Sequence, residues 1–365
     1  MKIGLYSPYV PTHVGGGEKY FFDVAKILAD LGHDVFILLE NKVSSSALHI
    51  EKIRLHYEVF LGISLEKISF ISSPFGSGTF WEKLFFTKKF DVLYLVTDGS
   101  LFFSMAKKNI VHIQIPFKKN NHTLIERLKL RNWSIRNSNS IFTQKIVEKS
   151  WNVPIQFVHY PMVELPLASF SEMKKEHVIL NVGRFFNHLH SKRQDVIVSS
   201  FIDLVNQNPK EMKDWKLILI GPAEDLEFSE KVKKMAKGYP VEILHDLNRD
   251  QLLSFYERAT LYWHAAGFEI DEELFPEKVE HFGISTVEAM NFGCVPLVVG
   301  KGGQIEVLGD SLEELLWQSK HDLLKLTLKL IKNSELRRGL AQLAITQSRK
   351  FNKVSFEKTI QEMLR

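Results

Sequence analysis

Short apolar runs alternate along this chain with longer segments in which apolar residues recur every three or four positions. The first run covers residues 2–7, and after a loop at 8–17 the helical spacing extends from residue 18 to 31. Gly32 follows directly, which is typical of a residue that ends a helix. A second run at 34–39 completes a strand–helix–strand unit. This alternation predicts an α/β protein with mainly parallel sheets.

The alternation occurs in two series. The further strands predicted in the first series are 67–71, 91–96, 109–114 and 140–142. A stretch without a clear period, through about residue 175, precedes a second series that begins with a strand at 177–182. Its other predicted elements are the helices 194–206, 228–237, 249–258 and 286–291 and the strands 215–220, 241–244, 261–264 and 296–299. Because 365 residues exceed what one hydrophobic core usually serves, we expect two doubly wound domains, 1–160 and 161–350.

The composition is that of an ordinary globular protein, with 45% hydrophobic and 25% charged residues. Charged residues interrupt every apolar stretch well short of the roughly 20 residues that a membrane-spanning helix needs. The first strand is too short for a signal-peptide core, so we expect a cytoplasmic protein. The single cysteine, Cys294, lies in the apolar run 294–299, where a buried thiol is favoured over a catalytic one.

Charge changes this picture in one region. The net charge is only +4, but residues 106–150 hold ten basic residues against Glu126 and Glu148, with apolar residues interleaved. The ten are Lys107, Lys108, Lys118, Lys119, Arg127, Lys129, Arg131, Arg136, Lys145 and Lys149. Such a surface suits an anionic membrane or a phosphate-bearing acceptor. A solvated helix face is the alternative, and no recognised motif supports a nucleic-acid partner.

Candidate chemistry is densest at residues 280–290. Glu280 and Glu288 stand eight positions apart, with a helix predicted to begin near Ser285 or Thr286. Both carboxylates can then face one ligand, while the helix N-terminus presents free N–H groups to an anion. Sugar hydroxyls and a diphosphate need this combination. The alternative is structural, because Ser285 and Glu288 also have the spacing of a capping box.

Two cations stand at a second position. Gly183 and Arg184 follow the strand 177–182, and Lys192 precedes the next predicted helix. An arginine fork and a lysine at one helix N-terminus can hold a departing diphosphate, although such a pair is often plain surface charge. His188 and His190 lie between them without a carboxylate or cysteine partner, which favours a surface loop over a metal site.

The first series holds weaker candidates. Gly15, Gly16 and Gly17 follow the first strand, and glycines let backbone approach a ligand, although a flexible turn has the same composition. His112 lies near the end of the strand 109–114 and could contact a sugar or position an acceptor. The alternative interpretation of His112 is a core histidine whose hydrogen bonds are made within the protein. Asp98 is a further candidate for the acceptor side.

The string from Glu280 to Met290, continued by Gly293–Pro296 and Lys301–Gly303, resembles the Glu-x7-Glu motif of retaining GT-B-fold glycosyltransferases of family 4. The resemblance covers most of the chain and is loosest from residue 41 to 90. It implies two Rossmann-like domains facing each other across a cleft, 1–160 for the acceptor and 161–350 for the nucleotide-sugar donor. It also implies that a last helix, 351–365, completes the first domain.

The resemblance further implies roles for individual residues. Glu280, Arg184, Lys192 and His112 would be catalytic, with Glu280 on the donor hexose and the two cations on the diphosphate. The donor-binding residues would be Gly15, Gly16, Gly17, Gly183, Phe282, Gly283, Ile284 and Glu288, with Glu288 on the ribose hydroxyls. No cofactor and no metal ion is expected.

These residues predict a retaining transferase that moves a hexose from a GDP- or UDP-sugar to a glycan or lipid-linked acceptor. Its setting would be polysaccharide or glycolipid synthesis, at or near the inner face of the cell membrane. The string at Glu280 leans towards mannose-like donors. The alternatives are a same-fold phosphorylase or epimerase, a non-catalytic nucleotide-sugar or partner-binding subunit, and a protein that only binds anionic surfaces.

Overall fold

The computed structural model describes residues 1–11, 15–42, 46–118, 123–163, 174–187 and 191–365. The chain divides into two compact units, each described here by itself. Unit 1 contains Met1–Met162 and Lys353–Arg365, and unit 2 contains Val163–Asn352. The predicted boundaries lie two residues before these. Most of the predicted linker, and both His188 and His190, fall outside the described residues.

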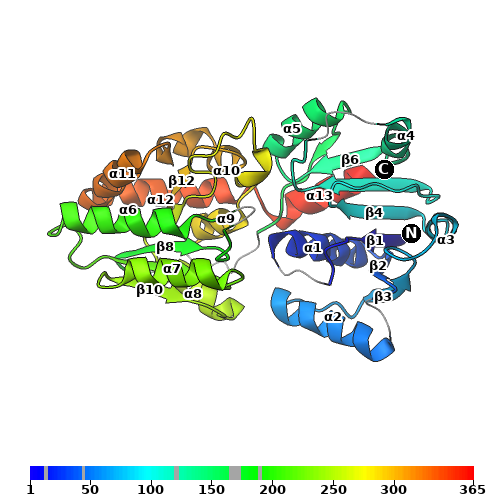
Figure 1. The fold of residues 1–365 in the computed structure, drawn as a ribbon, viewed down its shortest axis with the longest axis horizontal. Coiled ribbons are helices and arrows are strands. Elements are labelled where there is room, and N and C mark those ends of the chain that lie inside the picture. The colour runs from blue at the N-terminus through cyan, green and yellow to red at the C-terminus, as the bar shows by residue number, and fades with distance from the viewer. Residues whose placement is uncertain (12–14, 43–45, 119–122, 164–173, 188–190) are drawn as a thin grey trace. The chain divides into compact units, whose positions relative to one another are not determined.

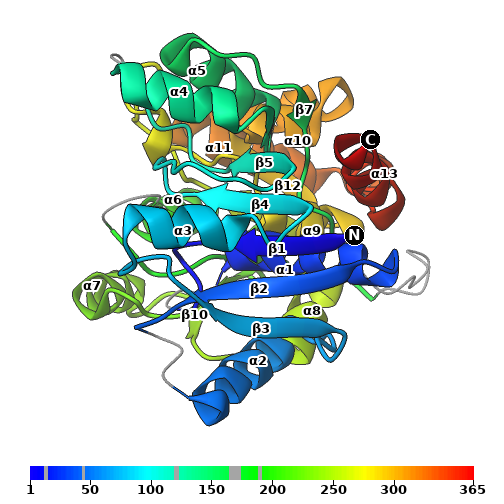
Figure 2. The same ribbon diagram turned by 90° about the vertical axis from the view of Figure 1, so that its right-hand side faces the viewer.

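Unit 1 is built on a seven-stranded sheet whose described pairings are all parallel. Its strands are β1 (Lys2–Tyr6), β2 (Asp34–Glu40), β3 (Ile68–Ser73), β4 (Val92–Thr97), β5 (Lys108–Ile113), β6 (Ile135–Ser138) and β7 (Phe157–Val158). Its helices are α1 (Gly16–Asp30), α2 (Ala47–Leu61), α3 (Phe80–Thr87), α4 (Leu124–Asn132), α5 (Ile141–Trp151) and α13 (Lys353–Leu364). The strand order is β3-β2-β1-β4-β5-β6-β7, and Figure 2 shows β3, β2, β1, β4 and β5 in succession.

Unit 2 repeats this plan with a six-stranded parallel sheet (Figure 1). Its strands are β8 (Val178–Val182), β9 (Lys216–Ile220), β10 (Val241–Leu244), β11 (Leu261–His264), β12 (Val295–Val299) and β13 (Leu316–Trp317). Its helices are α6 (Gln194–Gln207), α7 (Leu226–Ala236), α8 (Arg249–Arg258), α9 (Ile284–Asn291), α10 (Gln304–Leu308), α11 (Lys320–Lys332) and α12 (Ser334–Ser348), with 3-10 turns at Pro276–Lys278 and Asp310–Leu315. The order β10-β9-β8-β11-β12-β13 places its reversal between β8 and β11, where ligands of such sheets bind.

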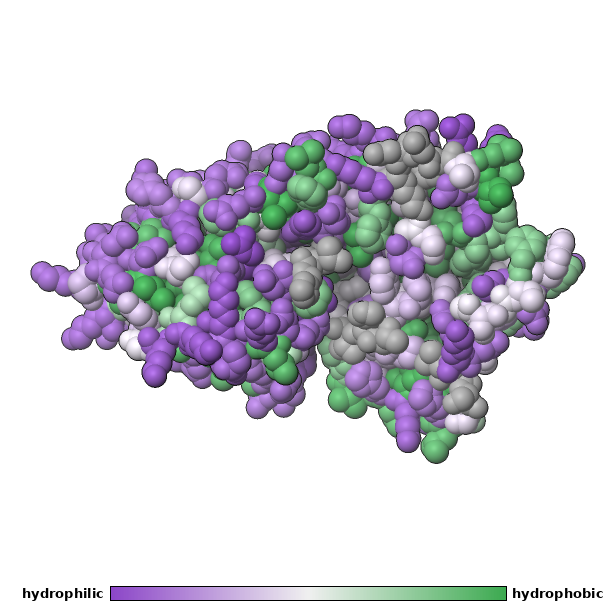
Figure 3. All heavy atoms as spheres, viewed as in Figure 1, coloured by the Kyte–Doolittle hydropathy of each residue, from purple (hydrophilic) through white to green (hydrophobic). Residues whose placement is uncertain are grey.

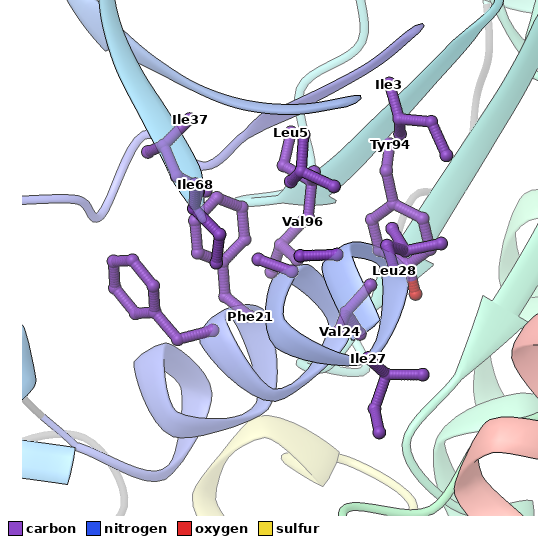
Figure 4. Packing of buried hydrophobic residues seen from close by; sticks show 14 of the residues in the cluster. Ile3, Leu5, Phe21, Val24, Ile27, Leu28, Ile37, Ile68, Tyr94 and Val96 are labelled. Carbon is purple, nitrogen blue, oxygen red and sulfur yellow. The ribbon is translucent and has the colours of Figure 1, made fainter. Parts of the chain in front are cut away.

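The apolar periodicity explains how α1 packs in unit 1. Phe21, Val24 and Leu28 recur at helical spacing and are at most 1% exposed. Figure 4 shows them directed at side chains of the sheet, including Leu5 and Val96. Because strands covered on both faces read as continuous apolar runs, the sequence located most of these strands within one or two residues.

Helix α13 belongs to unit 1 although it follows unit 2 in the sequence. Phe356, Ile360 and Met363 are at most 2% exposed and join the core cluster of α1. His159 Nε2 donates a hydrogen bond to the Phe356 carbonyl at 3.1 Å, and Lys108 Nζ donates to the Leu364 carbonyl at 2.5 Å. These contacts fix the helix at both ends.

The strand predicted at 140–142 is wrong. Ser140 caps α5, because its hydroxyl accepts the Thr143 N–H at 3.0 Å. The strand of this region is β6, which is polar in sequence yet holds the fully buried Asn137 and Ser138. Serine at a helix N-cap outweighs the β preference of the Ile141-Phe142 pair that follows it.

A buried polar network occupies the centre of unit 1. Tyr20 OH contacts Tyr94 OH at 2.6 Å and donates to His159 Nδ1 at 2.5 Å. His112 Nδ1 donates to Asn137 Oδ1 at 2.5 Å, and its ring stacks on Tyr20 with centroids 3.8 Å apart. Burial lowers the pKa of His112 to about 3 and that of His159 to about 3. Both rings are therefore neutral in the folded protein.

Stability is accordingly expected to fall between pH 6.5 and pH 5. In that interval the unfolded chain binds protons on His112 and His159 that the folded chain does not, so unfolding gains up to about 1.4 kcal/mol per pH unit for each ring. Urea unfolding at stepped pH measures this slope. The variant His112→Gln should show a smaller slope, and an identical slope would contradict the assignment.

Across the described residues, no helix combines the length and the apolar character that crossing a bilayer requires. Cys294 is fully buried, and burial raises the pKa of its thiol. Its Sγ contacts the carbonyls of Tyr256 and Ala259 at 3.2 Å each, which are the contacts of a core residue.

Candidate functional site

The site is built at the reversal of strand order in unit 2. Gly183 and Arg184 follow β8, and His264 is the last residue of the adjacent β11. Carboxyl ends of neighbouring parallel strands meet at one edge of a sheet, so topology brings these residues together across eighty positions of sequence. Lys192, before α6, reaches the same place.

Lys192 and Glu280 form the centre of the cluster. The Lys192 ammonium makes a very short hydrogen bond to Glu280 Oε2, and His264 Nε2 donates to the same oxygen at 2.9 Å. Burial alone would raise the pKa of the Glu280 carboxyl, but the charge of Lys192 and the His264 hydrogen bond hold it well below its usual range. Glu280 is therefore an anion throughout the physiological pH range.

His264 is a member of this cluster that the sequence reasoning missed. Its side chain is fully buried, and burial lowers the pKa of the ring, so Nε2 donates while Nδ1 remains an acceptor. Nδ1 has no hydrogen-bond partner among the residues that the structure describes. The sequence signal that could have indicated this residue is its place as the polar last residue of the apolar strand 261–264.

Glycines let the chain approach closely around this cluster. A Cβ on Gly183 would lie 2.7 Å from Lys192 Cγ, so glycine is what allows the lysine to pass over the end of β8. Gly303 N–H donates to the Glu280 carbonyl at 2.8 Å, and a Cβ on Gly302 would collide with that same carbonyl. The glycine turn after β12 thus supports the backbone that carries Glu280.

Gly183→Ala is expected to displace Lys192, since a 2.7 Å contact forces the lysine stem to move, and to reduce the rate of the sugar transfer predicted from the sequence at least tenfold. Gly339→Ala is the matched control. Gly339 lies in α12, where an added Cβ meets nothing within 4 Å, so the helix should gain up to about 1 kcal/mol. Rates measured beside thermal unfolding separate the two effects. Wild-type activity in Gly183→Ala would contradict the role given to Lys192.

Helix α9 begins earlier than the sequence suggested. Gly283, with φ +113°, is its N-cap, and the helix runs from Ile284. A side chain on Gly283 would be strained by that φ and would meet Gln304 Nε2 at 2.5 Å. Phe282, predicted to bind the donor, is 2% exposed and packs edge-on against Phe351 at 5.1 Å, so its ring belongs to the core.

Glu288 is held by two residues of α8. Arg249 Nη2 pairs with Oε1 at 2.7 Å, and Tyr256 OH donates to Oε2 at 2.9 Å. The capping-box alternative is wrong, because Ser285 lies inside the helix, where its Oγ accepts a hydrogen bond from the Tyr262 hydroxyl at 2.8 Å. The carboxylate of Glu288 thus points across to α8. Arg249 and Tyr256 were not predicted, since no local spacing reveals partners on another helix.

Arg184 is not joined to Lys192 by any described contact. Its Nη1 pairs with Glu224 Oε2 at 3.2 Å, and its guanidinium lies 4.9 Å from the centre of the Phe186 ring. Each cation thus has its own carboxylate, Glu224 for Arg184 and Glu280 for Lys192. Their joint action on a diphosphate remains a prediction.

The candidates in unit 1 lie at the corresponding edge of its sheet. Gly15 is the N-cap of α1, Gly16 is its first residue, and a Cβ on Gly17 would lie 2.7 Å from Gln114 Oε1. A side chain at position 17 would therefore displace the end of the flexible Gln114 side chain. His112 is fully buried in the polar network and has the contacts of the core alternative, so a sugar contact by His112 remains a prediction.

Among the described residues, no three His, Cys, Asp or Glu side chains are placed to hold a metal ion. The functional groups of the site are instead a carboxylate, an ammonium and an imidazole, which lie beside a helix N-terminus. Carboxylates accept hydrogen bonds from sugar hydroxyls, and the N–H groups at a helix N-terminus donate hydrogen bonds to phosphate oxygens. Such a site suits a nucleotide-linked sugar.

Solved structures of glycosyltransferases share this architecture. WaaG, a glycosyltransferase involved in lipopolysaccharide biosynthesis, matches at 14% identity with a TM-score of 0.64 over 99% of both chains. The sucrose-phosphate synthase of Thermosynechococcus elongatus matches at 15% identity and TM-score 0.68, over 100% of this chain and 98% of that one. A mutant of S. aureus TarM, in complex with Fondaparinux, alpha-GlcNAc-glycerol and UDP, matches at 9% and 0.70, over 100% and 99%. The chain has the GT-B fold of these enzymes.

Sequence similarity narrows the class. Residues 167–347, just under half of the chain, match the model of the family Glycosyl transferases group 1. A curated relative, the GDP-Man:Man(3)GlcNAc(2)-PP-Dol alpha-1,2-mannosyltransferase of Neurospora crassa, is 25% identical over 199 residues. That match covers 46% of this chain and 33% of the relative. The family match lies over unit 2, which holds the Glu280 cluster.

Proposed function

We propose that this chain is a retaining hexosyltransferase that uses a GDP- or UDP-sugar as donor. The observation that carries the proposal is the convergence of Lys192, His264 and Glu280 at the carboxyl ends of β8 and β11, with Glu288 on the adjoining helix. Glu280 would accept hydroxyls of the hexose, and Glu288 those of the ribose. The mannosyl donor in the name of the curated relative, and the UDP in the TarM complex, support these two donor classes.

In the proposed reaction the bond between the anomeric carbon and the diphosphate oxygen breaks, while an acceptor hydroxyl attacks the same face of the sugar. The hydroxyl proton passes to the leaving phosphate oxygen. Negative charge then grows on the diphosphate, where Arg184, Lys192 and the N–H groups at Gly283 and Ile284 would stabilise it. An ammonium has three N–H donors and Glu280 engages one, so Lys192 retains donors for phosphate.

Three finer points belong to the same proposal. The reaction needs no metal ion, because the two cations and the α9 N-terminus supply the positive charge. The acceptor is a glycan or lipid-linked glycan, in polysaccharide or glycolipid synthesis. The protein works in the cytoplasm, in contact with the membrane surface. Transfer that persists in excess EDTA would support metal independence, and transfer that stops would refute it.

The test of the whole proposal is a transfer reaction. Labelled GDP-mannose and UDP-hexoses, each with extracted glycolipid acceptors, should yield a labelled product from one donor only. NMR of that product should show the anomeric configuration of the donor. An inverted product would refute retention. Release of an epimerised donor without acceptor would refute transfer in favour of epimerisation.

A further inference from the structure

Helix α3 exposes aromatic side chains that a surface helix ordinarily buries. Phe80, Trp81 and Phe85 are 52%, 62% and 57% exposed. Their rings form one cluster, with centroids 5.1 Å apart for Phe80 and Trp81 and 6.0 Å apart for Trp81 and Phe85. A capping box at Thr79 and Glu82 fixes the start of this short helix. The aromatic face is thus an ordered feature of unit 1.

A second apolar group lies on α4. Leu124, Ile125 and Leu128 are 74%, 60% and 44% exposed. Figure 2 faces the end of unit 1 that carries α3 and α4, and Figure 3 shows hydrophobic side chains exposed there. We call these residues the apolar end surface: Phe80, Trp81, Phe85, Met105, Leu124, Ile125 and Leu128.

The segment 101–105 is bonded to both helices. Met105 N–H donates to the Thr87 hydroxyl at the end of α3, at 2.8 Å. Ser104 N–H donates to Asn132 Oδ1 at the end of α4, also at 2.8 Å. Phe103 in the same segment contacts the Phe80 ring, with centroids 6.2 Å apart. The aromatic and aliphatic groups are therefore held by a common support.

The helices that carry the apolar end surface have an excess of basic residues. Within residues 79–89 and 123–131, the basic residues are Lys83, Lys88, Lys89, Arg127, Lys129 and Arg131. The two carboxylates in those ranges, Glu82 and Glu126, are both engaged in capping boxes at the helix starts. Exposed aromatic residues beside lysine and arginine are the composition of proteins that lie on an anionic membrane.

We propose that the apolar end surface docks on an anionic lipid bilayer, with the α3 aromatic cluster entering the headgroup region and the surrounding cations contacting lipid phosphates. This surface would provide the membrane contact of the proposed function, and its docking does not depend on the transfer reaction. The docking element therefore differs from the basic stretch 106–150 that the sequence suggested. In that stretch Arg136 and Trp133 are buried, and Lys108 is bonded to the Leu364 carbonyl. The aromatic part of the surface lies outside that stretch, on α3.

Trp81 provides the test. The other five tryptophans, Trp133, Trp151, Trp215, Trp263 and Trp317, are at most 4% exposed. Trp81 should therefore dominate any change in tryptophan emission. Adding vesicles of phosphatidylcholine with about a third phosphatidylglycerol should shift the emission to shorter wavelength, and brominated lipid should quench it. Vesicles of phosphatidylcholine alone should bind at least tenfold more weakly.

Flotation with the same vesicles separates insertion from adsorption. Phe80→Ser, Trp81→Ser and Phe85→Ser combined should lower the bound fraction at least tenfold, whereas Leu55→Ser with Val59→Ser should leave it unchanged. Leu55 and Val59 are 47% and 83% exposed on α2, so the control removes apolar surface elsewhere on unit 1. Equal loss in both variants, or binding of wild type without a Trp81 shift, would overturn the proposal. Nucleoside-diphosphate binding by the triple variant tests the donor site separately.

Discussion

Replacing Lys192 with methionine is expected to lower the transfer rate about a hundredfold to a thousandfold. A positioned cation that meets charge developing on a leaving group commonly contributes this much. The substitution keeps the aliphatic stem that passes over Gly183 and removes only the ammonium. Donor binding should weaken less than the rate, because charge on the diphosphate grows as the bond breaks. Single-turnover kinetics at saturating donor measures the chemical step.

Loss of an ion pair also destabilises a protein, so the Lys192 variant needs a stability control. Methionine leaves the largely buried Glu280 carboxylate without its cation, which costs roughly 3 kcal/mol when such a pair is broken. Lys192→Met combined with Glu280→Gln removes the unpaired charge and should recover most of the stability but none of the rate. Lys329→Met breaks the exposed pair with Glu314 and should change neither. A Lys192→Met protein with near-wild-type rate would refute the assignment.

Glu288→Gln is expected to raise the donor dissociation constant about tenfold to a hundredfold. Hydrogen bonds to a charged partner contribute roughly 1.5–3 kcal/mol, and the amide loses that charge while keeping the shape. The change also removes the charge that balances Arg249. Isothermal titration with the preferred nucleoside diphosphate, with and without the sugar, measures the loss. Unchanged affinity would contradict a ribose contact by Glu288.

Tyr256→Phe serves as the matched variant for Glu288. It removes the 2.9 Å hydrogen bond to Oε2 and leaves the Arg249 pair in place. We expect a loss of about 1 kcal/mol in stability and only a few-fold change in donor affinity. A larger effect in Tyr256→Phe than in Glu288→Gln would mean that the tyrosine itself contacts the donor.

The fold was largely predictable because its signals are local. Strands covered on both faces read as apolar runs, and glycine or a polar cap separates them from helices, as at Gly32. β6 failed this rule because its buried residues are polar: Asn137 belongs to an internal network and Arg136 donates to three carbonyls. The same burial shows why a count of basic residues over 106–150 overstated the surface charge.

The site was predictable only in part, for a related reason. Glu280, Glu288 and Lys192 stand in recognisable local strings, and the structure brings Lys192 and Glu280 into contact. His264 and Arg249 lie on elements whose proximity depends on strand order, which no spacing along the chain encodes. For Arg184 the local sequence was misleading. It suggested a pair with Lys192, whereas the described ion pair of Arg184 is with Glu224.

The most direct test of the central claim is a thermal-shift measurement with GDP, UDP and their hexose conjugates, on wild type and on Glu288→Gln. A ligand at about 100 times its dissociation constant stabilises a folded protein by roughly 2.7 kcal/mol, which gives a visible shift. We expect a shift with one nucleoside diphosphate, a further shift with its sugar, and the loss of most of both in Glu288→Gln. No shift with any nucleotide, or equal shifts in both proteins, would contradict a nucleotide-sugar site at Glu288.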